Sequence, residues 1–273
     1  MYTEKEIKKY IKMLHLNPYA IKNIVEPTEE MKRIAVQENG QLLQYIESPS
    51  LEIQTLAIEN APKAIQYIPD PSPELLIKAI KRGWNNLEYI QNPSPQLIRL
   101  ALQESGWAIQ YIKNPSLELQ LLAVKKNYDA IKFIANPAPE VQQIAIEKNY
   151  EALRYVEHPT HEACCLAVKK SERALPLLRK ITKADAREYL QLNILSVKYL
   201  PPHIVFSEKE WGDLLREVIS QETVDETYIR NFINCHAFDK NGDVCPMNKL
   251  QFIYDYGSKK AKQITVDEKL SIK

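Results

Sequence analysis

Residues 113–156 read KNPSLELQLLAVKKNYDAIKFIANPAPEVQQIAIEKNYEALRYV, which is two consecutive 22-residue units that align without a gap. The same frame extends in both directions and repeats a proline and an alanine every 22 residues. The prolines are Pro27, Pro49, Pro71, Pro93, Pro115, Pro137 and Pro159, and the alanines are Ala35, Ala57, Ala79, Ala101, Ala123, Ala145 and Ala167. Seven units therefore cover 25–178. Weaker copies at 3–24 and 179–200 are typical of the caps of a repeat array, which makes about nine units.

Each unit predicts two short helices. The serine after the repeat proline, such as Ser116, is a suitable N-cap, and a proline such as Pro139 suits the first helical position. A first helix of about ten residues then ends at a residue such as Asn127. A second helix of about seven residues ends before the next proline. Helices this short are marginal alone, so the units are expected to stack into an all-α superhelical solenoid.

The unit at 114–134 follows the pattern N-P-S-x-E-x-Q-x-x-A-V-x-x-N-x-x-A-I-x-Y-I closely. It resembles the short α-solenoid repeats related to HEAT, armadillo and leucine-rich-repeat-variant proteins, and especially repeats of bacterial and phage proteins. The resemblance implies a scaffold that binds a protein partner and carries no catalytic motif. A phage-encoded or bacterial regulator or inhibitor of a host protein complex is the specific form it implies.

Residues 201–273 leave the 22-residue frame, and we interpret them as a small C-terminal capping domain after a solenoid domain at 1–200. Two S/T-x-x-E patterns predict the starts of two helices; they are Ser207 with Glu210 and Thr223 with Glu226. The Asn-Gly pair inside 236–245 suggests one β-hairpin, and 248–256 fits either a helix or a strand. The polar end, 257–273, is expected to be loosely held.

Composition narrows the function classes. The chain has 36 Lys and Arg against 35 Asp and Glu, a net charge of +1, which argues against a protein that binds polyanions in bulk. Six glycines are too few to supply both a Gly-rich phosphate loop and the turns of a many-stranded sheet. No apolar run is long enough to span a membrane, and the N-terminus lacks the apolar core of a signal peptide. With only four cysteines, two of them adjacent, a cytoplasmic protein is expected.

Aromatic residues outside the repeat consensus gather near the turn between the two helices of four successive units. Trp and Tyr are enriched at protein interfaces, and basic residues end the first helices beside them. The predicted partner-binding residues are Trp84, Asn85, Asn86, Trp107, Tyr128, Tyr150, Lys81, Arg82, Lys125 and Lys126. A protein partner is the leading prediction, and a nucleic acid or nucleotide along the same strip is the alternative. The recurrent aromatic residues are interpreted as core packing, with stacking on bases or peptide side chains as the alternative for the tyrosines; they are Tyr45, Tyr67, Tyr89, Tyr111, Phe133 and Tyr155.

Two groups of cysteine and histidine stand out, namely His158, His161, Cys164 and Cys165, and then Cys235, His236 and Cys245. His161 and Cys165 are four residues apart on one predicted helix, a spacing that can share a metal. Sequence drift at an exposed repeat position also explains these residues. No metal or cofactor site is therefore predicted. Metal binding or redox chemistry is the alternative. The chain carries none of the nucleophile-elbow, Walker or H-E-x-x-H motifs. We therefore predict a non-enzyme, with an activity seated in 201–273 as the remaining alternative.

Overall fold

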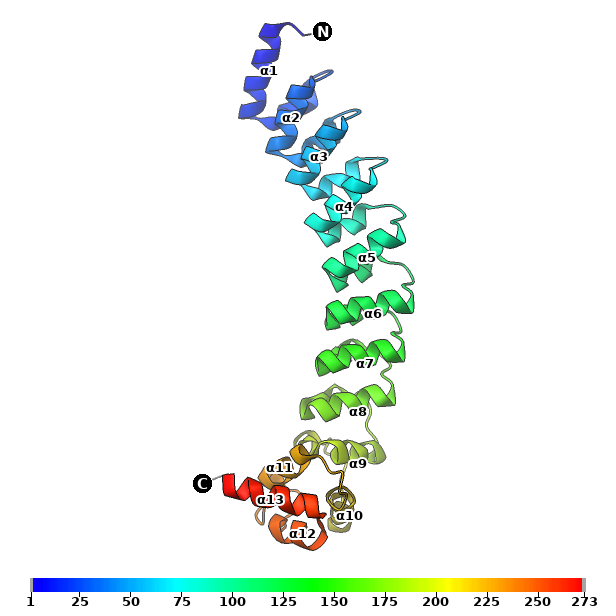
Figure 1. Cartoon of the computed structure of the whole chain (residues 1–273), viewed down its shortest axis with the longest axis vertical. Helices are drawn as coiled ribbons and strands as arrows, with labels where there is room; N and C mark the ends of the chain where they lie inside the picture. The colour runs from blue at the N-terminus through cyan, green and yellow to red at the C-terminus, as the bar shows by residue number, and fades with distance from the viewer. Residues whose placement is uncertain (1, 272–273) are drawn as a thin grey trace. The chain divides into compact units, whose positions relative to one another are not determined.

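The computed structural model describes residues 2–271, and residues 1, 272 and 273 lie outside that range. Every regular element within it is an α-helix or a 3-10 helix, which confirms the predicted all-α repeat fold. The chain divides into two compact units, Met1–Ala135 and Asn136–Lys273 (Figure 1). The division falls inside the repeat array and not at its end.

The first unit is a stack of two-helix repeats. Its α-helices are α1 (Glu4–Leu16), α2 (Glu29–Glu38), α3 (Leu51–Asn60), α4 (Pro73–Arg82), α5 (Pro95–Glu104) and α6 (Leu117–Lys126). The 3-10 helices between and after them are η1 (Pro18–Asn23), η2 (Gly40–Tyr45), η3 (Pro62–Tyr67), η4 (Trp84–Tyr89), η5 (Gly106–Tyr111) and η6 (Tyr128–Phe133). Consecutive α-helices contact one another in one layer, and consecutive 3-10 helices do so in a second layer. The second helix of each repeat is a 3-10 helix of six residues, which is slightly shorter than the predicted helix and more tightly wound than an α-helix.

Local signals in the sequence set the helix ends. The hydroxyls of Ser50, Ser72, Ser94 and Ser116 each accept a hydrogen bond from the third backbone N–H of the helix that follows, as predicted for N-caps. The residue before the repeat proline adopts a positive φ in five repeats, and three of these residues are asparagine, with φ of 50° at Asn92 and Asn114 and 54° at Asn136. Asparagine tolerates this left-handed conformation, which supplies the turn between repeats in a chain with few glycines.

The recurrent alanines are fully buried. The layer of α-helices and the layer of 3-10 helices come into backbone contact at two glycines. A Cβ at Gly106 would lie 2.2 Å from the carbonyl oxygen of Ala123, and the Gly106 N–H donates to Oδ1 of Asn127 across 2.9 Å. Gly40 has the same relation to Ala57, with its N–H donating to Asn60 across 2.8 Å. At Gly40 and Gly106 the 3-10 helix therefore lies too close to the α-helix of the next repeat for a side chain to fit.

The second unit continues the repeats and then adds the C-terminal helices. Its elements are α7 (Pro139–Lys148), η7 (Tyr150–Tyr155), α8 (His161–Lys170), η8 (Glu172–Leu177), α9 (Lys183–Leu192), η9 (Ile194–Tyr199), α10 (Glu208–Ile219), α11 (Glu226–Asn234), η10 (His236–Phe238), α12 (Lys249–Tyr256) and α13 (Lys259–Ser271). Leu190 and Val197 of the last repeat share one buried core with Trp211 and Phe232 of the C-terminal helices. The 22-residue frame ends at 200 as the sequence indicates, yet the core continues across that point.

Two expectations for the C-terminal segment are corrected. Within the described residues, 236–245 contains the short 3-10 helix η10 followed by turns and no strand, because Val244 and Cys245 both direct their N–H groups at the single carbonyl of Ala237 and build no ladder. The stretch 248–256, left open as helix or strand, contains α12. The polar end is also ordered over its described part, since α13 buries Ala261 and Ile264 in the core. Hydrogen bonds from Arg230 and Asn234 to the carboxylate of Glu268 also hold this helix against α11.

Candidate functional site

Trp84 and Trp107 come together in the first unit. Trp84 is the first residue of η4 and Trp107 the second residue of η5. Their ring centroids are 6.3 Å apart with an interplanar angle of 71°, an edge-to-face contact. The ring of Tyr111, at the end of η5, lies 6.2 Å from that of Trp84. We call Trp84, Trp107 and Tyr111 the aromatic cluster.

The Trp107 side chain is held in place although it is 37% exposed. Its indole Nε1 donates to Oδ1 of Asp129 across 2.8 Å. The ammonium of Lys132 lies 5.2 Å from the centre of the indole ring, a cation–π distance, and 3.4 Å from the other carboxylate oxygen of Asp129. Asp129 and Lys132 belong to η6, so the next repeat fixes an exposed indole of the previous one.

The recurrent aromatic residues divide into two groups. Tyr67 and Tyr89 are half-buried and pack against the core, as predicted, and Tyr111 is half-buried, whereas the other three are exposed. Tyr45 is 41% exposed, Phe133 37% and Tyr155 43%. Each stands last in a six-residue 3-10 helix, in which the third and fourth residues, such as Ala130 and Ile131, are buried instead. The sixth residue ends its 3-10 helix and precedes the loop that leads to the next repeat proline. Tyr111 accordingly adds to the surface around Trp84.

Asn86 does not belong to a binding surface. It is 4% exposed, and its amide donates to the carbonyl oxygens of Ala79 across 3.0 Å and Gly83 across 2.8 Å. These are carbonyls of the last turn of α4 and of its C-cap, so Asn86 completes the end of that helix. Its neighbour Asn85 is exposed, as predicted for a residue that contacts a partner.

The remaining predicted residues divide between the two units. The side chains of Lys81, Arg82, Lys125 and Lys126 are exposed in the last turns of α4 and α6. Tyr128 is half-buried at the start of η6. Tyr150 is half-buried at the start of η7 and belongs to the second unit. The structure therefore brings Trp84 and Trp107 into contact. It adds Tyr111, which the sequence assigns to the core, and Asp129 and Lys132, which the sequence pattern does not single out.

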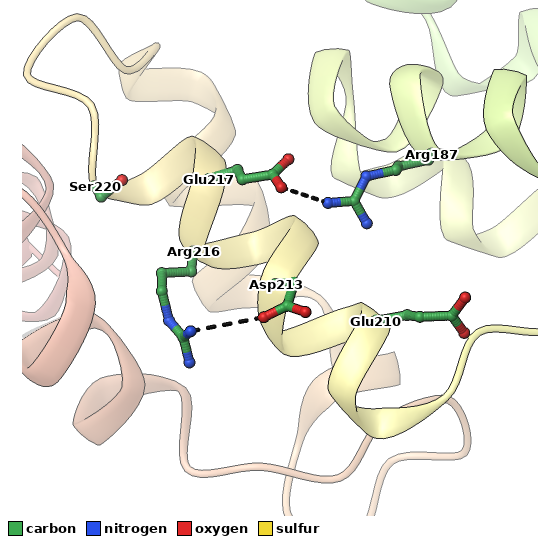
Figure 2. Close-up of a pocket in the computed structure, with 6 residues that line it drawn as sticks. All are labelled: Arg187, Glu210, Asp213, Arg216, Glu217 and Ser220. Atoms are coloured by element: carbon green, nitrogen blue, oxygen red, sulfur yellow. Dashed lines mark hydrogen bonds and ion pairs between the residues drawn. The ribbon is translucent and has the colours of Figure 1, made fainter.

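A charged hollow of about 400 Å³ lies between α9 and α10 in the second unit (Figure 2). Glu210, Asp213 and Ser220 line it together with two ion pairs. Arg187 bonds to Glu217 across 2.7 Å, and Arg216 lies 3.6 Å from Asp213. The first ion pair joins α9 to α10 and the second lies within α10, so the lining charges are paired with one another and the hollow is best explained as part of the junction between repeat and C-terminal helices.

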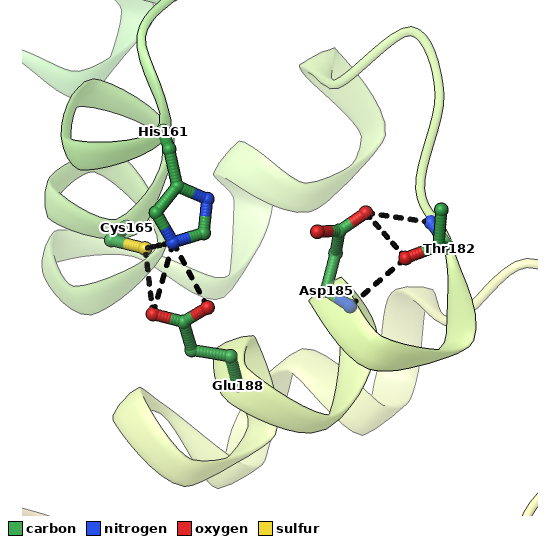
Figure 3. Close-up of polar contacts among 5 residues, drawn as sticks. All are labelled: His161, Cys165, Thr182, Asp185 and Glu188. Carbon is green, nitrogen blue, oxygen red and sulfur yellow. Dashed lines mark hydrogen bonds and ion pairs between the residues drawn. The ribbon is translucent and has the colours of Figure 1, made fainter.

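His161, Cys165 and Glu188 form a second polar cluster, drawn in Figure 3. His161 Nε2 lies 3.0 Å from Oε2 of Glu188 and 3.5 Å from Sγ of Cys165. Cys165 Sγ lies 3.4 Å from Oε1 of Glu188. The spacing of His161 and Cys165 was visible in the sequence, whereas Glu188 was missed because it belongs to the next repeat, where most units carry an apolar residue. Within residues 2–271, this is the single group of three potential metal ligands whose donor atoms converge.

The other cysteines and histidines of interest are placed apart from that cluster. Cys164 is buried beside Tyr189, and burial raises the pKa of its thiol. His158 is exposed before α8 begins. In the C-terminal helices, burial raises the pKa of both Cys235 and Cys245, which disfavours the thiolate form. The side chain of His236 is exposed and bonds to Asp239 across 3.0 Å.

Among the helices of residues 2–271, none is long and apolar enough to cross a lipid bilayer. Comparison of the chain with protein-family models, with curated proteins and with solved structures finds no match. Function is therefore inferred from the chemistry of this chain's own surfaces.

Proposed function

We propose that the protein is a non-catalytic repeat protein that binds a protein partner through the aromatic cluster of its first unit. The observation that carries this proposal is the state of Trp107, which is exposed and yet fixed by Asp129, Lys132 and Trp84. Interface hot spots are enriched in Trp and Tyr. A side chain that is already held loses little conformational entropy when a partner covers it.

The partner that suits this surface carries acidic side chains around an apolar contact. The last two residues of α4 are the exposed cations Lys81 and Arg82, and only Gly83 separates them from Trp84. Lys132 adds a further cation on the face of the Trp107 ring. Charge complementarity of this kind speeds encounter and sets register, while the buried aromatic anchors supply most of the binding free energy. In line with the resemblance to bacterial and phage repeats, the specific form that we propose is a cytoplasmic regulator of a host protein complex.

Single-stranded nucleic acid is the second candidate, since bases stack on exposed aromatic rings beside cations. The net charge of +1 argues against it, because binding to nucleic acid usually draws on many unpaired basic residues. Retention of a labelled oligonucleotide that falls steeply with salt would favour this candidate over a protein partner.

The experiment is capture of partners from the native host with tagged wild-type protein and with a Trp84→Ala, Trp107→Ala variant, followed by mass spectrometry. Truncation of interface anchors of this kind costs about 2 kcal/mol or more, which weakens binding at least about thirtyfold. The matched control is Tyr45→Ala, which removes an exposed aromatic side chain from another repeat of the same unit. Circular dichroism verifies folding of both variants. A double variant that folds and captures the same partners as wild type would refute the proposal.

A further inference from the structure

We propose that His161, Cys165 and Glu188 form a zinc site that joins α8 to α9 in the second unit and leaves one coordination position to water. This site is independent of the aromatic cluster, which lies in the first unit. For His161 and Cys165 it takes up the metal alternative that the sequence left open beside drift of a surface repeat position, and it adds Glu188. The cluster in Figure 3 supplies three different donor atoms from two adjacent repeats.

The local structure explains why the donors converge. His161 is the first residue of α8 and Cys165 the fifth, so one helical turn separates them and they project from the same face. Glu188 is the sixth residue of α9, and α8 and α9 are neighbours in the stack. The carboxylate therefore reaches both side chains from the facing helix.

The separations match those of a tetrahedral zinc ion. Bond lengths of about 2.0–2.1 Å to nitrogen and oxygen and about 2.3 Å to sulfur place tetrahedral N–O neighbours about 3.4 Å apart and neighbours of sulfur about 3.6 Å apart. Here the N–O separations are 3.0 and 3.1 Å, the S–N separation is 3.5 Å and the S–O separation is 3.4 Å. The observed separations are shorter than the tetrahedral values by at most a few tenths of an ångström. Small rotations of these surface side chains are sufficient to remove that difference.

The donor set selects the metal. An imidazole, a thiolate and a carboxylate suit Zn²⁺, whereas Mg²⁺ and Ca²⁺ require oxygen ligands. The side chains of His161 and Glu188 are 52% and 45% exposed, so a fourth ligand can reach the ion from solvent. Three protein ligands and one water complete the tetrahedral geometry.

Binding is an exchange of one proton for one metal ion. Without metal, the Cys165 thiol donates to Oε1 of Glu188 across 3.4 Å. Zn²⁺ displaces this proton to solvent, and a Zn–S bond replaces the S–H bond. The thiolate, the carboxylate and a neutral imidazole then balance the two positive charges of the ion.

A hydrogen-bonded cluster without any metal function predicts the same contacts, so the test is direct metal binding. The purified chain is dialysed against Zn²⁺, and in parallel against Mg²⁺, and bound metal is measured by elemental mass spectrometry. We expect one Zn²⁺ per chain and no retained Mg²⁺. His161→Ala, Cys165→Ser and Glu188→Gln should each weaken zinc binding by at least about tenfold, since even outer-shell partners of metal ligands contribute that much. His158→Ala and Cys164→Ala are the matched controls, and both should bind zinc as wild type does.

Co²⁺ supplies a second measurement. The wild-type chain should show a thiolate-to-cobalt charge-transfer band, which Cys165→Ser abolishes and Cys164→Ala retains. Zinc should also raise the midpoint of thermal unfolding of the wild type and not of the three ligand variants, because it binds the folded chain. Failure of the wild type to retain zinc, or retention equal in all three ligand variants, would overturn the proposal. Loss of binding in the His161 and Cys165 variants alone would overturn the role of Glu188.

Discussion

Asp129 accepts a hydrogen bond from the indole Nε1 of Trp107 across 2.8 Å and thereby ties η5 to η6. The two residues occupy the same position of consecutive 3-10 helices, one repeat apart. In most other units this position holds a polar or charged residue, and the pairing of an indole with a carboxylate is specific to this place in the array. Asp129 thus acts as a positioning residue for the exposed ring that we propose as the main partner contact.

Asp129→Ala should release Trp107 without unfolding the first unit. The chain has three tryptophans, so three indole N–H signals are expected by NMR. One of them should shift and exchange faster with solvent in the variant, because a hydrogen bond to a charged acceptor, worth about 1.5–3 kcal/mol, is lost. Partner binding should weaken as well. Glu151→Ala changes the same repeat position one unit later and should leave all three signals in place; if Asp129→Ala does so too, the bond does not hold the ring.

The repeat frame was sufficient to predict the α-helices of the array, because the serine caps and the residues that end each first helix act within one unit. It did not predict features that depend on neighbouring units or on helix type. An aromatic residue at a fixed repeat position predicts core packing, and the sequence does not show that this position ends a 3-10 helix and is exposed at Tyr45, Phe133 and Tyr155. Glu188 was missed because its partners belong to another repeat. Asn86 was taken for a contact residue, although its amide serves the end of α4.

Ala101→Leu and Ala123→Leu should each destabilise the fold by about 1–3 kcal/mol, because neither alanine has any exposed surface and a larger side chain overpacks the contact. The measurement is the urea midpoint followed by circular dichroism. Gln103→Leu adds the same side chain at an exposed position of α5, two residues from Ala101, and should change the midpoint little. Equal midpoints for Ala101→Leu and Gln103→Leu would show that the array adjusts to the larger residue.

Gly106→Ala and Gly212→Ala should have opposite effects on stability. A Cβ at Gly106 would lie 2.2 Å from the carbonyl oxygen of Ala123, so η5 must move away from α6, at a cost of about 1–3 kcal/mol. Gly212 is inside α10, and nothing lies within 4 Å of the Cβ that alanine would add. Alanine there should stabilise by up to about 1 kcal/mol, since it favours the helix over glycine. Thermal unfolding of the two variants side by side decides the matter, and a stable Gly106→Ala variant would contradict the close approach of the two layers.

Glu210 should make the second unit sensitive to acid. Its carboxylate bonds to the ammonium of Lys183 across 2.6 Å and to the backbone N–H of Ser207 across 2.7 Å. These contacts, with that of Lys183 the largest, lower the pKa of Glu210 to about 2 from an ordinary value of 4.5. A lowered folded-state pKa stabilises the fold at any pH above the unfolded value, and this stabilisation disappears as pH falls from about 4.5 through about 2. Glu210→Gln should therefore flatten the dependence of the urea midpoint on pH in this window, because glutamine keeps the capping contact to Ser207 and does not titrate. Glu208→Gln removes a carboxylate from the same helical turn outside the capping box, and it should leave most of the slope intact. Identical slopes for wild type and Glu210→Gln would show that other acids control the response.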